Sequence, residues 1–200
     1  MSQIPELMAG RALGHGIALA VDHGRGGGAK MYVGGQAKAT VADGTAHVNN
    51  ATEGSLEKLA IPANALVPGS TIRIWASGIV VDENGTDTLT IFIRLGAHAT
   101  LPASNVAAFT SAAIDAVDAD VYAIQGVIQI RTTTTAVAMW SYQDPDAAAT
   151  PPKFQNTASF AVDTTVPMYL DFSADHSGAA HLDNETNATM FVVDIVNPST

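Results

Sequence analysis

The feature that most constrains this chain is a period-two alternation of apolar and polar residues, the pattern of a strand with one buried face. It is clearest in residues 71–81 and 88–95. The apolar members are Ile72, Ile74, Ala76 and Val80 in the first segment, and Leu89, Ile91, Ile93 and Leu95 in the second. Both segments are therefore predicted to be half-buried β-strands.

The link between these two segments contains Asn84-Gly85. Both residues tolerate a positive φ, and Asn-Gly between alternating strands is a strong short-range hairpin signal. We therefore expect the strand of residues 71–81 to pair with the strand that begins at Thr88.

Further strands are predicted at similar spacing, separated by Pro, Gly and Asn turn signals. They cover residues 121–131, 135–142, 157–162, 168–172 and 188–196, the last mostly apolar and therefore expected at the centre of a sheet. Only residues 106–119 could form a helix, and their Thr, Ser and Asp content fits a short turn or loop equally well. Many short strands with turns between them indicate an all-β jelly roll or β-sandwich.

The chain divides into two zones of different amino-acid composition. Residues 1–55 are rich in Gly and Ala and contain few large apolar side chains. They are predicted to be an extended, glycine-rich N-terminal arm, with short strands at residues 16–21 and 37–41, that needs a partner surface to be ordered. The alternative is that they supply edge strands to their own domain. Residues 56–200 are predicted to form the sandwich domain.

Charge and composition exclude several classes of function. Nine basic and nineteen acidic residues give 9 − 19 = −10, with no basic run, so a nucleic-acid partner is not expected. The chain has no Cys, which removes disulfides and thiolate chemistry. The best N-terminal apolar run, residues 16–21, is too short to span a membrane, and Glu6, Arg11 and His15 argue against a signal peptide.

The glycine-rich segment at residues 23–30 invites two phosphate-binding interpretations. A Walker loop fails because Ala29 precedes Lys30 and Met31 follows it, so the metal-binding hydroxyl is missing. The dinucleotide fingerprint Gly24-x-Gly26-x-x-Ala29 requires a helix next, which residues 31–35 cannot supply. We interpret the segment as a flexible connector and expect no cofactor.

Two clusters of acidic residues could suggest a metal-binding site. Asp82, Asn84 and Asp87 have the composition of a calcium loop, but the EF-hand Gly and bidentate carboxylate are missing at the required positions, so a hairpin turn explains them better. The second group has oxygen and imidazole ligands close together: Asp171, Asp175, His176, His181, Asp183 and Glu185. We interpret it as a solvated loop and assign no metal site.

No catalytic motif in the sequence singles out a candidate active site. It contains no Gly-x-Ser-x-Gly elbow and no His-Glu-x-x-His helix. His15, His23 and His47 are expected to make ordinary polar contacts. Trp75, Trp140 and Tyr142 are expected in the core or an interface, because each can bury a large apolar area. The chain is therefore predicted not to be an enzyme.

A series of turn and strand segments occurs at residues 59–74, 78–80, 84–96, 120–122, 128–132 and 136–140. Their order resembles that in tailed-bacteriophage virion structural proteins, described as decoration or fibre-like components with a jelly-roll domain. The similarity spans residues 56–142 and leaves out residues 1–55 and the last fifty or so.

The resemblance implies a capsid decoration, or cement, protein that binds the outer surface of a phage head and stabilises the shell. Its implied partner is the major capsid protein, and its implied state is a homotrimer on the virion, assembled in the host cytoplasm. The alternative is a tail-fibre or receptor-binding module in which Trp75, Trp140 or Tyr142 would stack on host surface glycans. A glycan-degrading enzyme is a third possibility, which would need two carboxylates together in a groove.

Overall fold

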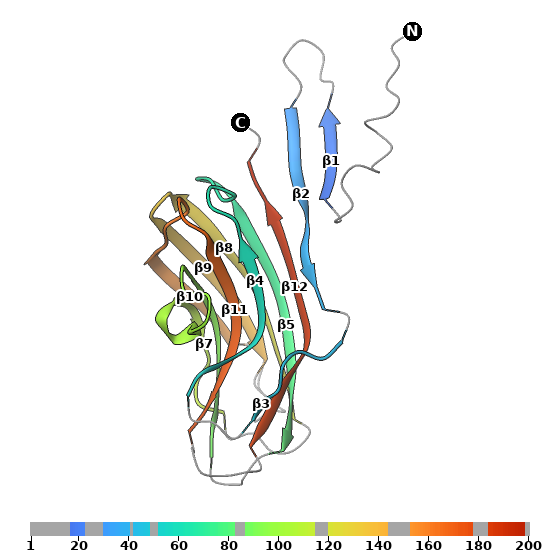
Figure 1. The fold of residues 1–200 in the computed structure, drawn as a ribbon, viewed down its shortest axis with the longest axis vertical. Helices are drawn as coiled ribbons and strands as arrows, with labels where there is room; N and C mark the ends of the chain where they lie inside the picture. The colour runs from blue at the N-terminus through green and yellow to red at the C-terminus, as the bar shows by residue number, and fades with distance from the viewer. Residues whose placement is uncertain are drawn as a thin grey trace.

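Two antiparallel β-sheets pack face to face in this computed structural model (Figure 1). The structure describes residues 17–22, 30–40, 42–48, 52–82, 87–114, 120–143, 153–177 and 184–198. Sheet A has the order β1 (Ile17–Asp22), β2 (Lys30–Ala39), β12 (Glu185–Val196), β5 (Thr71–Asp82), β8 (Val121–Thr132), β9 (Thr135–Gln143), β10 (Lys153–Ala161), with β3 (His47–Val48) also beside β12. Sheet B has the order β4 (Gly54–Ile61), β11 (Met168–His176), β6 (Leu89–Gly96), β7 (Val106–Thr110). The predicted all-β fold, a jelly roll or β-sandwich, is confirmed as two packed antiparallel sheets.

The core lies between the sheets and consists of one face of the strands from β4 onward. The apolar residues predicted to face inward in β5 and β6 are all buried, and β8 adds Tyr122, Ile124, Ile128 and Ile130. From β11, Leu170, Phe172 and Ala174 complete the opposing layer. The prediction that residues 188–196 form a central strand is also confirmed, since β12 pairs with β5 on one side and with β2 and β3 on the other. The period-two pattern therefore identified the buried faces correctly.

The predicted hairpin between residues 71–81 and 88–95 is wrong. Strand β5 pairs with β12 and β8 in sheet A, whereas β6 pairs with β11 and β7 in sheet B. The intervening link crosses between the layers, and residues 83–86, with Asn84-Gly85, lie outside the described residues. Two amphipathic strands can bury their apolar faces side by side or opposite each other, and here they lie opposite.

A tight hairpin joins β8 and β9 instead. Its strands pair from Ala123↔Gln143 to Thr132↔Thr135, which leaves a two-residue turn at Thr133-Thr134. The Thr132 and Thr135 hydroxyl oxygens lie 2.8 Å apart, and the backbone N–H of Thr134 donates to Thr132 Oγ1 at 3.1 Å. Side-chain hydrogen bonds thus support a turn that has no Asn or Gly.

In residues 106–114, the described part of the segment considered for a helix or loop, the structure contains a strand. Strand β7 covers Val106–Thr110 and pairs with β6, while residues 115–119 lie outside the described part. Ala108 and Phe109 are both buried, and the Ala108 carbonyl accepts hydrogen bonds from Trp140 Nε1 at 2.6 Å and Thr157 Oγ1 at 2.5 Å. Contacts with sheet A therefore stabilise a strand here, although the local sequence favours a helix or a loop only weakly.

The N-terminal zone contributes strands β1 and β2 to one edge of sheet A. The expected strands at residues 16–21 and 37–41 overlap them, although β2 begins earlier, at Lys30. Strand β2 pairs with β12 between residues 34–39 and 192–196, and β1 pairs with β2 (Figure 1). Lys38 forms an ion pair with Glu57 of β4. Every core residue that the structure identifies lies at Leu56 or later.

Candidate binding face on the larger sheet

The solvent face of sheet A carries a row of aligned side chains across four strands. Antiparallel register places Trp75 of β5 beside Gln125 of β8, Gln125 beside Ser141 of β9, and Ser141 beside Phe154 of β10. A second row, two residues further along each strand, consists of Arg73, Val127, Met139 and Asn156. The period of two along each strand thus gathers these residues on one face.

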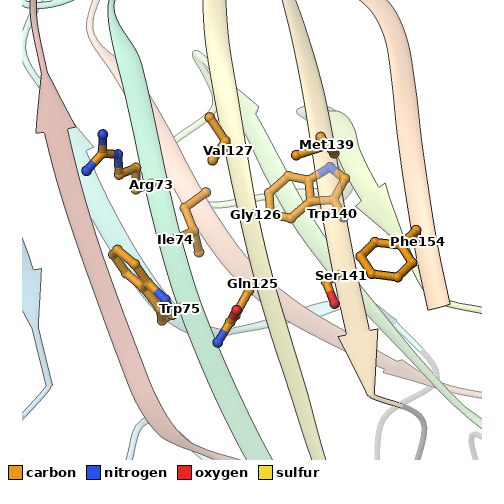
Figure 2. Close-up of a pocket in the computed structure, with 10 residues that line it drawn as sticks. All are labelled: Arg73, Ile74, Trp75, Gln125, Gly126, Val127, Met139, Trp140, Ser141 and Phe154. Atoms are coloured by element: carbon orange, nitrogen blue, oxygen red, sulfur yellow. The ribbon is translucent and has the colours of Figure 1, made fainter. Parts of the chain in front are cut away.

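Two adjoining hollows, here called the outer groove, lie on this face. The first has a volume of about 220 Å³ and is lined by Arg73, Ile74, Trp75, Gln125, Gly126, Val127, Met139, Trp140, Ser141 and Phe154 (Figure 2). The second has a volume of about 450 Å³ and is lined by Thr71, Val127, Gln129, Arg131, Val137, Ala138, Met139, Asn156 and Thr157. They share Val127 and Met139, so the two hollows adjoin.

Large apolar side chains in the groove face solvent. Phe154 is 80% exposed and Met139 is 59% exposed, while Trp75 is half-buried. In Figure 2, Trp75 and Phe154 lie at opposite ends, with Gln125 and Ser141 between them. Exposed apolar groups gathered in a hollow, rather than scattered singly, are typical of a binding surface.

The charge of the groove differs from that of the whole protein. Its lining contains Arg73 and Arg131 and no Asp or Glu, although the chain carries nineteen acidic residues. Asp194 of β12 is the cross-strand neighbour of Arg73 but does not line either hollow. The groove is therefore a basic and aromatic area on an acidic protein.

The three aromatic residues named from the sequence separate into two environments. Trp140 and Tyr142 are buried, and Phe109 packs against both, with ring centroids 5.6 Å apart in each pair. Their predicted core position is confirmed, so neither can stack on a ligand at the surface. Trp140 lines the floor of the first hollow but is 1% exposed, whereas Trp75 is half-buried and is the one of the three that offers a ring to a ligand. Sequence reasoning missed Phe154, because the predicted strand began at residue 157 and β10 begins at Lys153.

The predicted solvated acidic loop is wrong for the described members of that group. Asp171, Asp175 and His176 belong to β11, and Asp171 and His176 are buried. Asp171 Oδ1 accepts a hydrogen bond from Ser55 at 2.8 Å and lies 3.3 Å from Lys58 Nζ. Burial raises the pKa of Asp171, and these partners oppose that shift. The carboxylate faces out of sheet B but is covered by neighbouring side chains.

A second buried ion pair lies nearby on the same face of sheet B. The Arg94 guanidinium binds both oxygens of Glu53, at 2.6 Å through Nε and 2.5 Å through Nη2, and Ser173 also donates to Glu53. Burial raises the pKa of Asp175, and the charge of Glu53 adds to that effect. Within the described ranges, no three His, Cys, Asp or Glu side chains are placed to hold a metal ion. This network links strands rather than forming an open site.

The structure describes only some of the remaining candidate site residues. Of the calcium-like turn, Asp87 is buried and accepts a hydrogen bond from Asn184 at 2.8 Å. His181, Asp183, His15 and residues 23–29, which include His23, lie outside the described residues. The residues that would have to form a dinucleotide-binding helix belong to strand β2, as the sequence interpretation required.

His47 and His176 form a buried pair between β3 and β11. Their rings are parallel, with centroids 5.4 Å apart, and within the described residues neither His176 nitrogen has a hydrogen-bond partner. Burial lowers the pKa of His176 from 6.5 to about 4; the charge of His47 adds to this effect and that of Asp87 opposes it. His176 is therefore neutral in the folded protein at neutral pH.

This pair predicts a loss of stability in acid. Between pH 6.5 and about 4 the unfolded chain binds a proton at His176 that the folded protein does not, so the free energy of unfolding falls as pH falls. In His176→Phe this loss should be smaller. Asp171 and Asp175, whose raised pKa values make the folded protein more stable as the pH falls, are present in both proteins. Urea unfolding at pH 7 and pH 4.5 measures the difference. An equal loss in both proteins would contradict the assignment.

Comparisons with known proteins add little about function. No family model matches this chain, and no curated protein matches it in sequence. It is similar to the solved structure of lectin II from Ulex europaeus, at 13% identity and TM-score 0.36, covering 92% of this chain and 93% of that one. It is also similar to the metal-free form of lectin I-B4 from Griffonia simplicifolia, at 8% identity and TM-score 0.32, covering 90% and 87%. Such values do not indicate what this chain binds.

In the part of the chain that the structure describes, no helix has the length and apolar character needed to cross a bilayer.

Proposed function

We propose that this protein is a structural component of a tailed-phage virion, a decoration protein that binds the outer surface of the head as a homotrimer and catalyses no reaction. The resemblance of residues 56–142 to phage virion proteins supports this assignment. A β-sandwich whose described residues gather no catalytic group is suited to such a role. Its site of action is then the outer capsid surface, after assembly in the host cytoplasm.

The observation that carries the proposal is the β1–β2 edge of sheet A. Within the described residues, β1 pairs on one side only, with β2, and is the last strand of the sheet. An unpaired edge strand presents a row of backbone N–H and C=O groups that a partner strand can satisfy. The major capsid protein is the proposed partner at this edge. Attachment there keeps the sandwich core intact.

Shell stabilisation follows from mass action. A protein that binds the assembled lattice more tightly than free capsid subunits shifts the equilibrium towards the lattice. The acidic charge of the decoration protein suits the outside of the head, away from packaged DNA. No cofactor or chemical step is needed for this effect.

Binding to undecorated heads tests the proposal. Purified protein mixed with heads of the phage that encodes it should co-sediment with them and reach a saturating, stoichiometric level. Heads already saturated with the native protein are the control and should bind no more. Failure to sediment with undecorated heads would overturn the decoration function.

The alternative is a tail-fibre or receptor-binding module. Trp75 and Phe154 favour it, because exposed aromatic rings can stack on sugar rings. This alternative places the protein at the tail, so it predicts no binding to isolated heads.

A further inference from the structure

The outer groove is not used by the proposed attachment through β1. We propose that it binds an acidic oligosaccharide, a chain of sugar rings that carries carboxylates. This inference goes beyond the decoration function and holds whether the protein lies on the head or the tail. It rests on the backbone, the aromatic residues and the charge of the groove.

The backbone of the groove argues against a peptide strand as the ligand. Strands β5, β8 and β9 are each paired on both sides, so their N–H and C=O groups are engaged within the sheet. A peptide lying across them would find few partners for its own main chain. The groove offers side-chain groups instead: Thr71, Gln125, Gln129, Ser141 and Asn156. These amides and hydroxyls can bind sugar hydroxyls.

The aromatic residues provide two separate apolar contacts. Trp75 and Phe154 are three strand intervals apart in one row, which at the usual strand spacing is about 14 Å. The first hollow, of about 220 Å³, is smaller than the typical pocket for a drug-sized molecule. A chain of small rings, with its apolar ring faces on Trp75 and Phe154, fits this arrangement better than one bulky ligand.

The charge selects an acidic rather than a neutral sugar. Each hollow contains one arginine, Arg73 in the first and Arg131 in the second, and no carboxylate. Arginine can bind a carboxylate through two parallel hydrogen bonds. Elsewhere the protein carries a large excess of negative charge, which repels an anionic ligand. The groove is thus favoured over the rest of the surface for an anionic chain.

The test uses galacturonic acid oligosaccharides, and the same oligosaccharides as methyl esters for a neutral control. The two Trp residues of the chain, Trp75 and Trp140, both line the first hollow, so binding there should change the Trp fluorescence, and loss of most of the change in Trp75→Phe assigns it to Trp75. We expect saturable binding of the acid form that weakens with added salt. The ester should bind more weakly.

Variants locate the binding. Trp75→Ala and Phe154→Ala should each weaken binding by about tenfold, as loss of one aromatic contact implies. Trp75→Phe should keep most of the affinity, measured by calorimetry because it lacks the reporting indole. Arg73→Gln and Arg131→Gln should weaken binding of the acid but not of the ester. Val121→Ala, at an exposed apolar residue of β8 outside both hollows, should change nothing.

Three results would overturn the inference: no saturable binding at millimolar sugar, equal affinity for acid and ester, or unchanged affinity in both Trp75→Ala and Phe154→Ala. Circular dichroism of each variant checks that it is folded. The assay contains no phage heads, so its failure and a failure to bind heads are separate results.

Discussion

Replacing Trp140 with Ala should lower the free energy of unfolding by about 3–5 kcal/mol, the usual loss for a buried large aromatic residue. Trp140 is 1% exposed, and its indole N–H donates to the Ala108 carbonyl at 2.6 Å. Its neighbour Gly126 leaves room for the ring, since a Cβ there would lie 1.8 Å from Trp140 Cε3. The indole therefore joins β9 of sheet A to β7 of sheet B.

Urea unfolding followed by circular dichroism measures this loss. Met139→Ala is the matched control, because Met139 is the preceding residue on β9 and is 59% exposed. It should change stability by no more than about 0.5 kcal/mol. If Trp140→Ala does not fold, Trp140→Phe should fold with a smaller loss. A loss below about 1 kcal/mol in Trp140→Ala would show that the indole is not a main contact between the sheets.

Deleting residues 1–30 should weaken binding to undecorated heads by tenfold or more, about 1.4 kcal/mol, while the sandwich stays folded. The deletion removes β1 and its proposed capsid-binding edge. It leaves in place every core residue that the structure describes, because all of them lie at Leu56 or later. Quantitative co-sedimentation with heads gives the affinity, and circular dichroism gives the fold.

Two shorter changes are controls for this deletion. Removing residues 1–16 leaves β1 in place and should preserve binding. Replacing Gly26, Gly27 and Gly28 with Ala should have a smaller effect than the deletion, because it restricts the chain without removing the strand. If the chain without residues 1–30 binds heads as tightly as the full chain, attachment lies in the sandwich. If it unfolds, those residues are needed for the fold.

The sequence predicted which residues are buried better than it predicted which strands pair. Alternation along residues 71–81 and 88–95 identifies a buried face by local spacing alone. Pairing depends on which other strands compete for each edge, and β5 is flanked by β12 and β8 rather than by β6. The Asn84-Gly85 signal is local and cannot report that competition.

The candidate site shows the same limit. Trp75 was recognised as an aromatic residue that could bind, but its neighbours Gln125, Ser141 and Phe154 come from three other strands and meet it only through register. Asp171 illustrates the reverse case. A carboxylate in an acidic stretch is expected in solvent, and only the fold brings Ser55 and Lys58 to cover it.

The most direct test of the proposed function is the position of this protein on purified phage particles, determined by cryo-electron microscopy. We predict density for the β-sandwich on the outer surface of the head, arranged as trimers, with β1 directed towards the major capsid protein. Density at the tail tip would favour the receptor-binding alternative. Its presence only at the tail, or its absence from the particle, would contradict the decoration function.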